Sequence, residues 1–155
     1  MKNKKYIILE IIPTRSDPKY GIIAQLSALK LNGLVLEGRF DYRLKEEKIK
    51  NPDILRMIHY DKEDFTYVDS SEEIMNALKE FIEDYDLLII DNSYTKKYLA
   101  KIKNKKKSIF KYLHMKYSDD VIDKVVEKYQ LEKSNYIVDL LYEALIFESN
   151  NKGSK

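Results

Sequence analysis

The spacing of apolar residues predicts three antiparallel strands in the first third of the chain. Tyr6–Ile12 is an apolar run suited to a β-strand, and Pro13 ends it. Residues 22–31 form a second run, whose later part partly alternates between apolar and polar positions, as a strand with one solvated face does. An Asn-Gly pair at 32–33 favours a tight hairpin, after which residues 34–44 return as the third strand.

The remainder of the chain alternates between helical and strand-like patterns. Residues 70–84 predict a helix, because a serine at 70 or 71 can cap it and apolar residues recur along one face. Residues 86–90 are a short apolar run of the fully buried strand type. Further helices are expected at 95–102, 119–130 and 135–147, and a fifth strand at 108–113. This order predicts an α/β fold with a mixed five-stranded sheet flanked by helices, although periodicity alone leaves other mixed arrangements open.

Composition limits the class of protein further. The chain has 155 residues, of which 44% are hydrophobic, and we expect one domain over residues 1–148 with a disordered tail at 149–155. Cysteine is absent, which excludes disulfides, thiol catalysis and a zinc ribbon. No apolar run approaches the roughly 20 residues that a membrane helix needs, so we expect a cytoplasmic protein with no membrane partner. The formal net charge of +2 gives no global argument for nucleic acid, and any such argument depends on local patches.

Three motifs follow the predicted strands in a characteristic order. They are Glu10-Ile-Ile-Pro-Thr-Arg15 in the first strand and the turn after it, Asp91-Asn-Ser-Tyr-Thr-Lys96 after the fourth strand, and Ser134-Asn-Tyr-Ile-Val-Asp-Leu140 in the last helix. Together they resemble the DnaQ-like (DEDD) 3′→5′ exonucleases, especially the proofreading domains of bacterial replicative polymerases. The resemblance extends from about residue 5 to residue 148 and implies a ribonuclease-H-like fold.

The resemblance also implies what a working site would contain. Active members gather four carboxylates around two metal ions, and a histidine takes a proton from the attacking water. In this chain Glu10 and Asp139 stand at the first and last acid positions. Ile12 stands at the second acid position and Thr95 at the third, or Lys96 if the alignment has no gap.

A serine at 134 replaces the catalytic histidine, and a lost general base alone costs about 10²–10⁴ in rate. We therefore predict a degenerate homologue that is catalytically inactive and acts by binding. Its partner would be single-stranded DNA or RNA in the former cleft, or a protein of replication or repair.

An alternative set of acids is compatible with a second hypothesis, that the protein is a metal-dependent 3′→5′ exonuclease. Glu10, Asp91 and Asp139 could supply oxygen ligands for Mg²⁺ or Mn²⁺ at neighbouring strand ends. Each acid also has a structural interpretation: Glu10 in a salt bridge, Asp91 as a turn former or helix cap, and Asp139 as a solvated residue. A third hypothesis is a purely structural protein-interaction module.

Lysines and aromatic residues gather between residues 94 and 112. Lys105, Lys106 and Lys107 could neutralise phosphates, while Tyr94 stacks on a base and Asn92 forms hydrogen bonds. The structural alternative is a solvated lysine-rich face.

Overall fold

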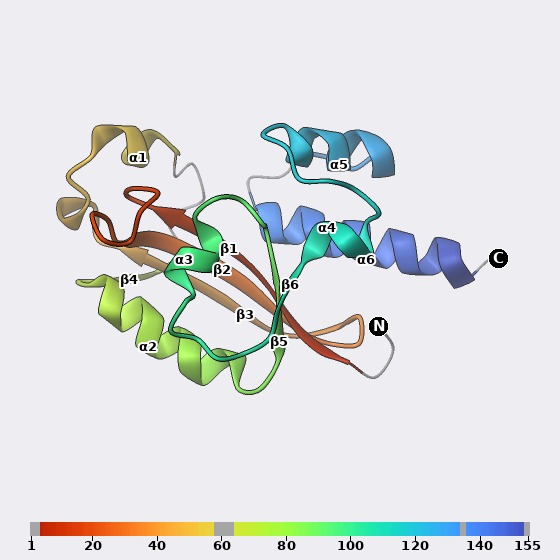
Figure 1. Ribbon diagram of the computed structural model, residues 1–155, viewed down its shortest axis with the longest axis horizontal. Helices are drawn as coiled ribbons and strands as arrows, with labels where there is room; N and C mark the ends of the chain where they lie inside the picture. Colours follow the sequence, from red (N-terminus) through yellow and green to blue (C-terminus); the bar gives the residue numbers. More distant parts are fainter. Residues whose placement is uncertain (1–3, 58–63, 134–135, 154–155) are drawn as a thin grey trace.

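The chain forms a mixed sheet of six strands, which helices cover on both faces (Figure 1). The structure is a computed structural model and describes residues 4–57, 64–133 and 136–153. In these residues the strand order is β4-β3-β2-β1-β5-β6, with β2 antiparallel to both neighbours and the other neighbouring pairs parallel. The α/β class and the mixed sheet are confirmed, but the sheet has six strands where the pattern predicted five. The strands are β1 (Lys5–Pro13), β2 (Ile23–Asn32), β3 (Val35–Leu44), β4 (Thr66–Val68), β5 (Asp86–Ile89) and β6 (Lys106–Ser108).

The first three strands lie where the apolar runs predict them. β1 is buried over all but its first residue, because it pairs with β2 on one side and with β5 on the other. At the turn between β2 and β3, Gly33 has a φ of 61°, a left-handed conformation that glycine adopts without steric cost. The resulting register places Glu10 opposite Ser27, and Ser27 opposite Asp41 on the next strand.

Two short elements differ from the prediction. β4 has only three residues and pairs with the last three residues of β3, so it is too short for a periodic pattern to reveal. The fifth strand predicted at 108–113 is wrong, because β6 ends at Ser108 and helix α4 (Ile109–Tyr112) follows at once. Ser108 starts this helix, since its hydroxyl accepts a hydrogen bond from the Phe110 N–H at 3.3 Å.

The helices divide between the two faces of the sheet (Figure 1). Helix α2 (Ser71–Ile82) covers one face, while α4, α5 (Val121–Tyr129) and α6 (Ile137–Gly153) cover the other. Helix α3 (Thr95–Tyr98) is shorter than the 95–102 helix that the sequence predicts, and α6 continues through part of the predicted tail as far as Gly153. The remaining elements are the 3₁₀ turn η1 (Glu46–Lys48) and α1 (Pro52–Met57). Within the described ranges, no helix is both long and apolar enough to cross a membrane.

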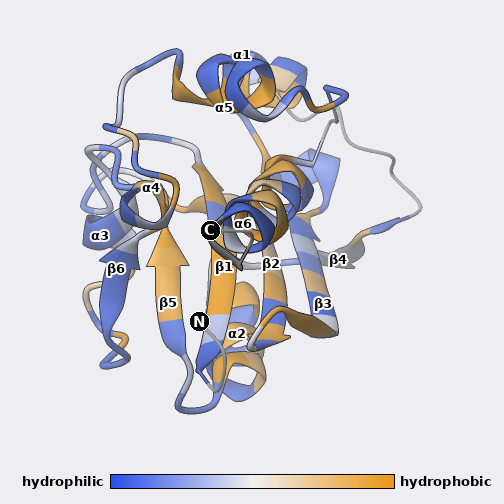
Figure 2. Cartoon of the chain, turned by 90° about the vertical axis from the view of Figure 1, so that its right-hand side faces the viewer, coloured by the Kyte–Doolittle hydropathy of each residue, from blue (hydrophilic) through white to orange (hydrophobic). Residues whose placement is uncertain are grey.

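Alternating side chains of β1 serve two apolar layers. Ile7 and Leu9 pack in the layer that contains α2, whereas Tyr6 and Ile8 pack in the layer that contains α4, α5 and α6. Figure 2 shows α6 crossing in front of the apolar strands β1 and β2. β1 therefore lies between α2 on one face of the sheet and α6 on the other.

Ser70 caps α2 through a reciprocal pair of hydrogen bonds. Its hydroxyl accepts from the Glu73 N–H at 3.3 Å, and the Glu73 carboxylate accepts from the Ser70 N–H at 3.1 Å. Ser70→Ala should lower the free energy of unfolding by about 1 kcal/mol, because an N-terminal N–H of the helix loses its acceptor. Urea unfolding measures the change, with Ser16→Ala in an exposed loop as a control expected to stay within about 0.5 kcal/mol. Equal midpoints for the two variants would show that the cap contributes nothing.

Candidate functional site

A small cleft lies where the parallel strands β1 and β5 end. Glu10 comes directly after Leu9, the last β1 residue that pairs with β5, and its side chain is 9% exposed. The cleft has a volume of about 140 Å³. Its walls come from β1, the segment after β5, the start of α5 and the start of α6; they include Glu10, Ile11, Asn92, Tyr94, Thr95, Tyr117, Asp119 and Ile137. This is the place where the motif alignment puts the catalytic centre of an exonuclease.

At the position that the resemblance assigns to the third acid, Thr95 stands in place of a carboxylate and is hydrogen-bonded to Asn92. The Asn92 side-chain oxygen accepts from the Thr95 N–H at 2.9 Å and from the Thr95 hydroxyl at 2.7 Å. It also accepts from the Tyr94 N–H at 3.3 Å, so Asn92 fixes the start of α3. Thr95 is 1% exposed. The side-chain oxygen of Asn92, a residue predicted to bind nucleic acid, is therefore already hydrogen-bonded within the protein.

Tyr94 brings a neutral hydroxyl group into the cleft beside Glu10. Burial raises the pKa of Tyr94, and the nearby carboxylate of Glu10 raises it further, while a hydrogen bond with the Asn92 side chain opposes the shift. The phenol therefore stays protonated at neutral pH. Tyr117 is 38% exposed and offers an aromatic surface at the same cleft.

The three acids of the alternative metal set line three separate hollows. Glu10 lines the cleft, Asp91 lines a hollow rich in lysine, and Asp139 lines an open hollow between α5 and α6. The residue by which α6 contributes to the cleft is Ile137. In the part of the chain that the structure describes, no three His, Cys, Asp or Glu residues are grouped to hold a metal ion. These residues do not fit the two-metal centre that the resemblance implies; residue 134, at the histidine position, lies outside the described residues.

Asp139 is bound by an arginine of the sheet. Arg39 on β3 donates from Nη1 and Nη2 to the two carboxylate oxygens of Asp139, at 2.8 and 3.0 Å. Its Nε donates to Asp41 at 2.6 Å, and its guanidinium lies 4.9 Å from the centre of the Tyr136 ring. The carboxylates raise the pKa of Arg39, with Asp139 contributing most. Arg39 thus links α6 to β3 through a permanent positive charge.

A row of buried polar side chains crosses β2 and β3 beside this arginine. Gln25 lies opposite Arg43, and Ser27 lies opposite Asp41. All four are less than 9% exposed. Some buried polar atoms of this row have no hydrogen-bond partner among the described residues: Nε2 and Oε1 of Gln25, Oγ of Ser27, Oδ1 of Asp41, and Nε and Nη1 of Arg43. The row was not predicted from the sequence, although polar residues at alternate positions of two strands were a readable signal.

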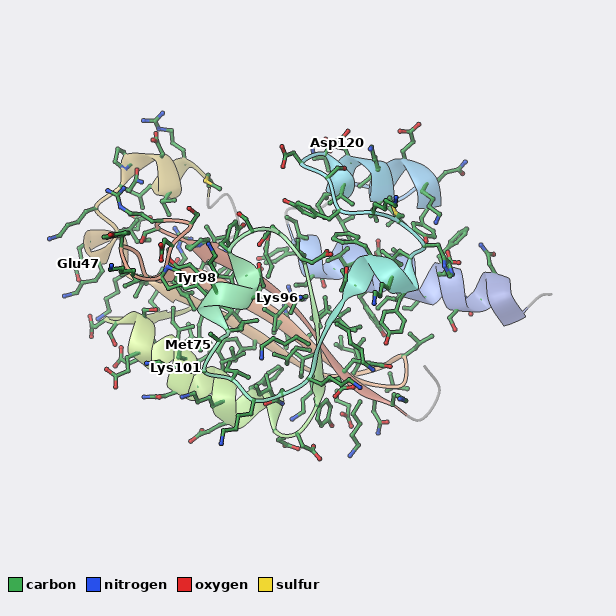
Figure 3. The ribbon with its side chains drawn as sticks, viewed as in Figure 1. Glu47, Met75, Lys96, Tyr98, Lys101 and Asp120 are labelled. Carbon is green, nitrogen blue, oxygen red and sulfur yellow. The ribbon has the colours of Figure 1, made fainter. Side chains whose placement is uncertain are left out.

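The predicted lysines do meet, in a hollow of about 510 Å³ beside the cleft. We call it the lysine pocket; it is lined by Asp91, Lys96, Lys105, Lys106, Lys107, Ser108, Lys111 and Tyr112. Figure 3 shows Lys96 extending from α3 toward α4. Asn92 and Tyr94, the other two residues of the predicted nucleic-acid set, line the cleft instead. Asp91 and Asn92 are consecutive, so the segment after β5 contributes to the walls of both hollows.

Solved structures that share this architecture include two 3′-exonucleases and exonuclease I from Escherichia coli. A full-length 3′-exonuclease superposes with a TM-score of 0.65 at 14% identity, over 99% of this chain and 84% of its own. A 3′-exonuclease described for 3′-end-specific recognition of a histone mRNA stem-loop gives 0.65 at 12% identity, over 95% of this chain and 64% of its own. Zinc-bound Escherichia coli exonuclease I with single-stranded DNA gives 0.60 at 10% identity, over 97% of this chain and 42% of its own.

The chain therefore has the ribonuclease-H-like fold of the DnaQ-like exonucleases, and the resemblance seen in its motifs is confirmed at the level of the fold. It spans less than half the length of exonuclease I from Escherichia coli. No protein-family profile matches the sequence, and no curated protein is significantly similar to it.

Proposed function

We propose that this chain is an exonuclease-fold protein that binds single-stranded nucleic acid and does not hydrolyse it by the two-metal route. The observation that carries this proposal is the distribution of the acids over three separate hollows. Two-metal hydrolysis needs ions about 4 Å apart, held by shared carboxylates. Here Thr95 donates its hydroxyl to Asn92, and Asp139 is neutralised by Arg39. Neither side chain is arranged to complete a metal centre with Glu10.

The lysine pocket and the cleft supply what single-strand binding requires. Positive side chains attract phosphates, and an exposed ring such as that of Tyr117 can stack on a base. The Escherichia coli structure with single-stranded DNA and the 3′-exonuclease that recognises a histone mRNA stem-loop support nucleic acid as the ligand class of this fold.

The test combines a cleavage assay and a binding assay on the same samples. A 5′-labelled single strand, DNA and RNA in parallel, is incubated with Mn²⁺ or with EDTA and then measured by fluorescence anisotropy. We expect no shortening in either condition, and binding that weakens as salt increases. Changing Lys105, Lys106 and Lys107 to Gln should lower the slope of log Kd against log salt by about 2, because each lost phosphate contact removes about 0.7 for a single strand.

A matched control uses Lys45, Lys48 and Lys50, which follow β3 near the opposite edge of the sheet. Counting only pairs between described residues, each triple contains one ion-paired lysine, since Lys45 lies 3.0 Å from Asp69 and Lys107 lies 3.3 Å from Asp86. The control triple should leave the slope unchanged.

Two outcomes would overturn the proposal. A metal-dependent ladder from the 3′ end that Glu10→Ala abolishes would establish the alternative exonuclease. Absence of both cleavage and binding would leave a protein-interaction module as the function.

A further inference from the structure

We propose that the lysine pocket binds a terminal phosphomonoester, the phosphate at an end of a strand or on a free nucleotide, in preference to an internal phosphodiester. This inference rests on the proposed function and specifies its ligand. The pocket is separate from the cleft where the fold carries its catalytic groups, and Ser108, Lys111 and Tyr112 belong to its wall but not to any motif of the resemblance.

The pocket carries an excess of positive charge. Five lysines and one aspartate line it, and Asp86 pairs with Lys107, which leaves an excess of three positive formal charges. A phosphodiester carries one negative charge, whereas a phosphomonoester carries about −1.5 to −2 at pH 7 and has three free acceptor oxygens. The concentration of lysine therefore matches the more highly charged group better.

Two lysines are held in place at the pocket. Lys107 lies 3.3 Å from Asp86 and 5.7 Å from the centre of the Tyr6 ring, and the contact with Asp86 raises the pKa of Lys107. Lys106 donates to the backbone carbonyls of Ile102 and Asn104. These contacts fix the two ammonium groups before a ligand arrives, which reduces the entropy lost on binding.

Three further lysines and one hydroxyl of the pocket can also donate to an anion. Lys96, Lys105 and Lys111 are exposed, and no ion pair joins them to another described residue. The Ser108 hydroxyl accepts from the Phe110 N–H, so its own proton can be donated to an anion. The phosphate thus meets lysines of α3, β6 and α4 together with one hydroxyl.

The walls of the pocket and the place of Asp91 also favour the end of a strand. The hollow is lined by residues of α3, of the segment after β5, of β6 and the residue before it, and of α4. An internal phosphate continues into sugars on both sides, whereas a terminal phosphate needs an exit on one side only. Asp91 repels the phosphate itself but can accept a hydrogen bond from the hydroxyl of the attached sugar, as acidic residues do in dinucleotide sites.

The experiment compares internally labelled 12-nucleotide strands with a 5′-phosphate, a 3′-phosphate or two hydroxyl ends. Anisotropy is measured for the wild type, for Lys105→Gln/Lys111→Gln and for the control Lys48→Gln/Lys50→Gln. We expect a phosphate at one end to tighten wild-type binding about tenfold, and this gain to disappear in the first variant and persist in the control. Lys96→Gln provides a second, single substitution on a different wall.

Competition with adenosine monophosphate and with inorganic phosphate, at constant ionic strength, identifies the source of the phosphate. If either competes as well as the phosphorylated strand, the site belongs to a small phosphomonoester. Equal affinities for all three strands, with binding retained, would overturn this inference and leave the proposed function intact. Absence of binding to every strand would overturn the proposed function instead.

Discussion

Arg39→Met should lower the free energy of unfolding by about 3 kcal/mol. The guanidinium contacts Asp41 at 2.6 Å and Asp139 at 2.8 Å, and the Asp41 side chain is only 5% exposed. Removing the arginine leaves the Asp41 charge buried without its counter-ion, which typically costs about 3–5 kcal/mol. We take the lower end of that range because Arg39 itself is 36% exposed and water can reach part of the site.

Urea unfolding measures this loss, provided that the variant and the wild type have the same m-value. Asp139→Asn is the matched control. Asp139 is 33% exposed, so its contact with Arg39 is screened, and the control should lose only about 1 kcal/mol. Adding Asp41→Leu to Arg39→Met should recover most of the stability, because it removes the stranded charge. If Arg39→Met and Asp139→Asn lose the same amount, Asp41 does not depend on Arg39 for its charge balance.

Phe110→Ala should lower the free energy of unfolding by about 4 kcal/mol, because it empties a buried aromatic position. Phe110 is 1% exposed and belongs to the apolar layer between the sheet and helices α4, α5 and α6. For a domain of this length the loss corresponds to a fall in Tm of about 10 °C. Calorimetry of the variant measures both quantities.

Tyr112→Phe, on the same helix, separates packing from hydrogen bonding. The change removes the contact between the Tyr6 and Tyr112 hydroxyls, which are 3.2 Å apart, and keeps the ring. It should lower the free energy of unfolding by about 1 kcal/mol. If Phe110→Ala costs no more than this control, α4 would not be part of the core.

Local chemistry explains which parts of the fold could be predicted. The Asn-Gly turn at 32–33, the Ser70 cap and the apolar run of β5 each depend on neighbours in sequence, and the structure shows all three. β4 and β6 are three-residue strands, defined by pairing with distant residues rather than by any pattern of their own. The apolar run after Ser108 is compatible with either a strand or a helix. In the structure it is a helix, which Ser108 caps.

Individual residues of the candidate site could be predicted from the sequence, but their arrangement in space could not. The gathering of Lys105, Lys106 and Lys107 needs only their adjacency in sequence, and the structure adds Lys96 and Lys111 from two other elements. The predicted grouping of Glu10, Asp91 and Asp139 is not found. It would have required α6 to turn Asp139 toward the cleft, where Ile137 lies instead, and Asp139 is bound by Arg39. Arg39 lies 100 residues away from Asp139, and no local spacing connects the two.

The hydrogen bonds between Asn92 and Thr95 have an evolutionary consequence. The four carboxylates that the resemblance implies would require acids at positions 12 and 95, which are 7% and 1% exposed, and the release of Asp139 from Arg39. Each substitution alone would bury a charge before enough ligands exist to bind the metal that would offset it. Thr95→Asp would also remove the hydroxyl that donates a hydrogen bond to Asn92. Each single substitution toward a four-carboxylate site would therefore lower stability before it could contribute to metal binding, which restricts the order in which such mutations could accumulate.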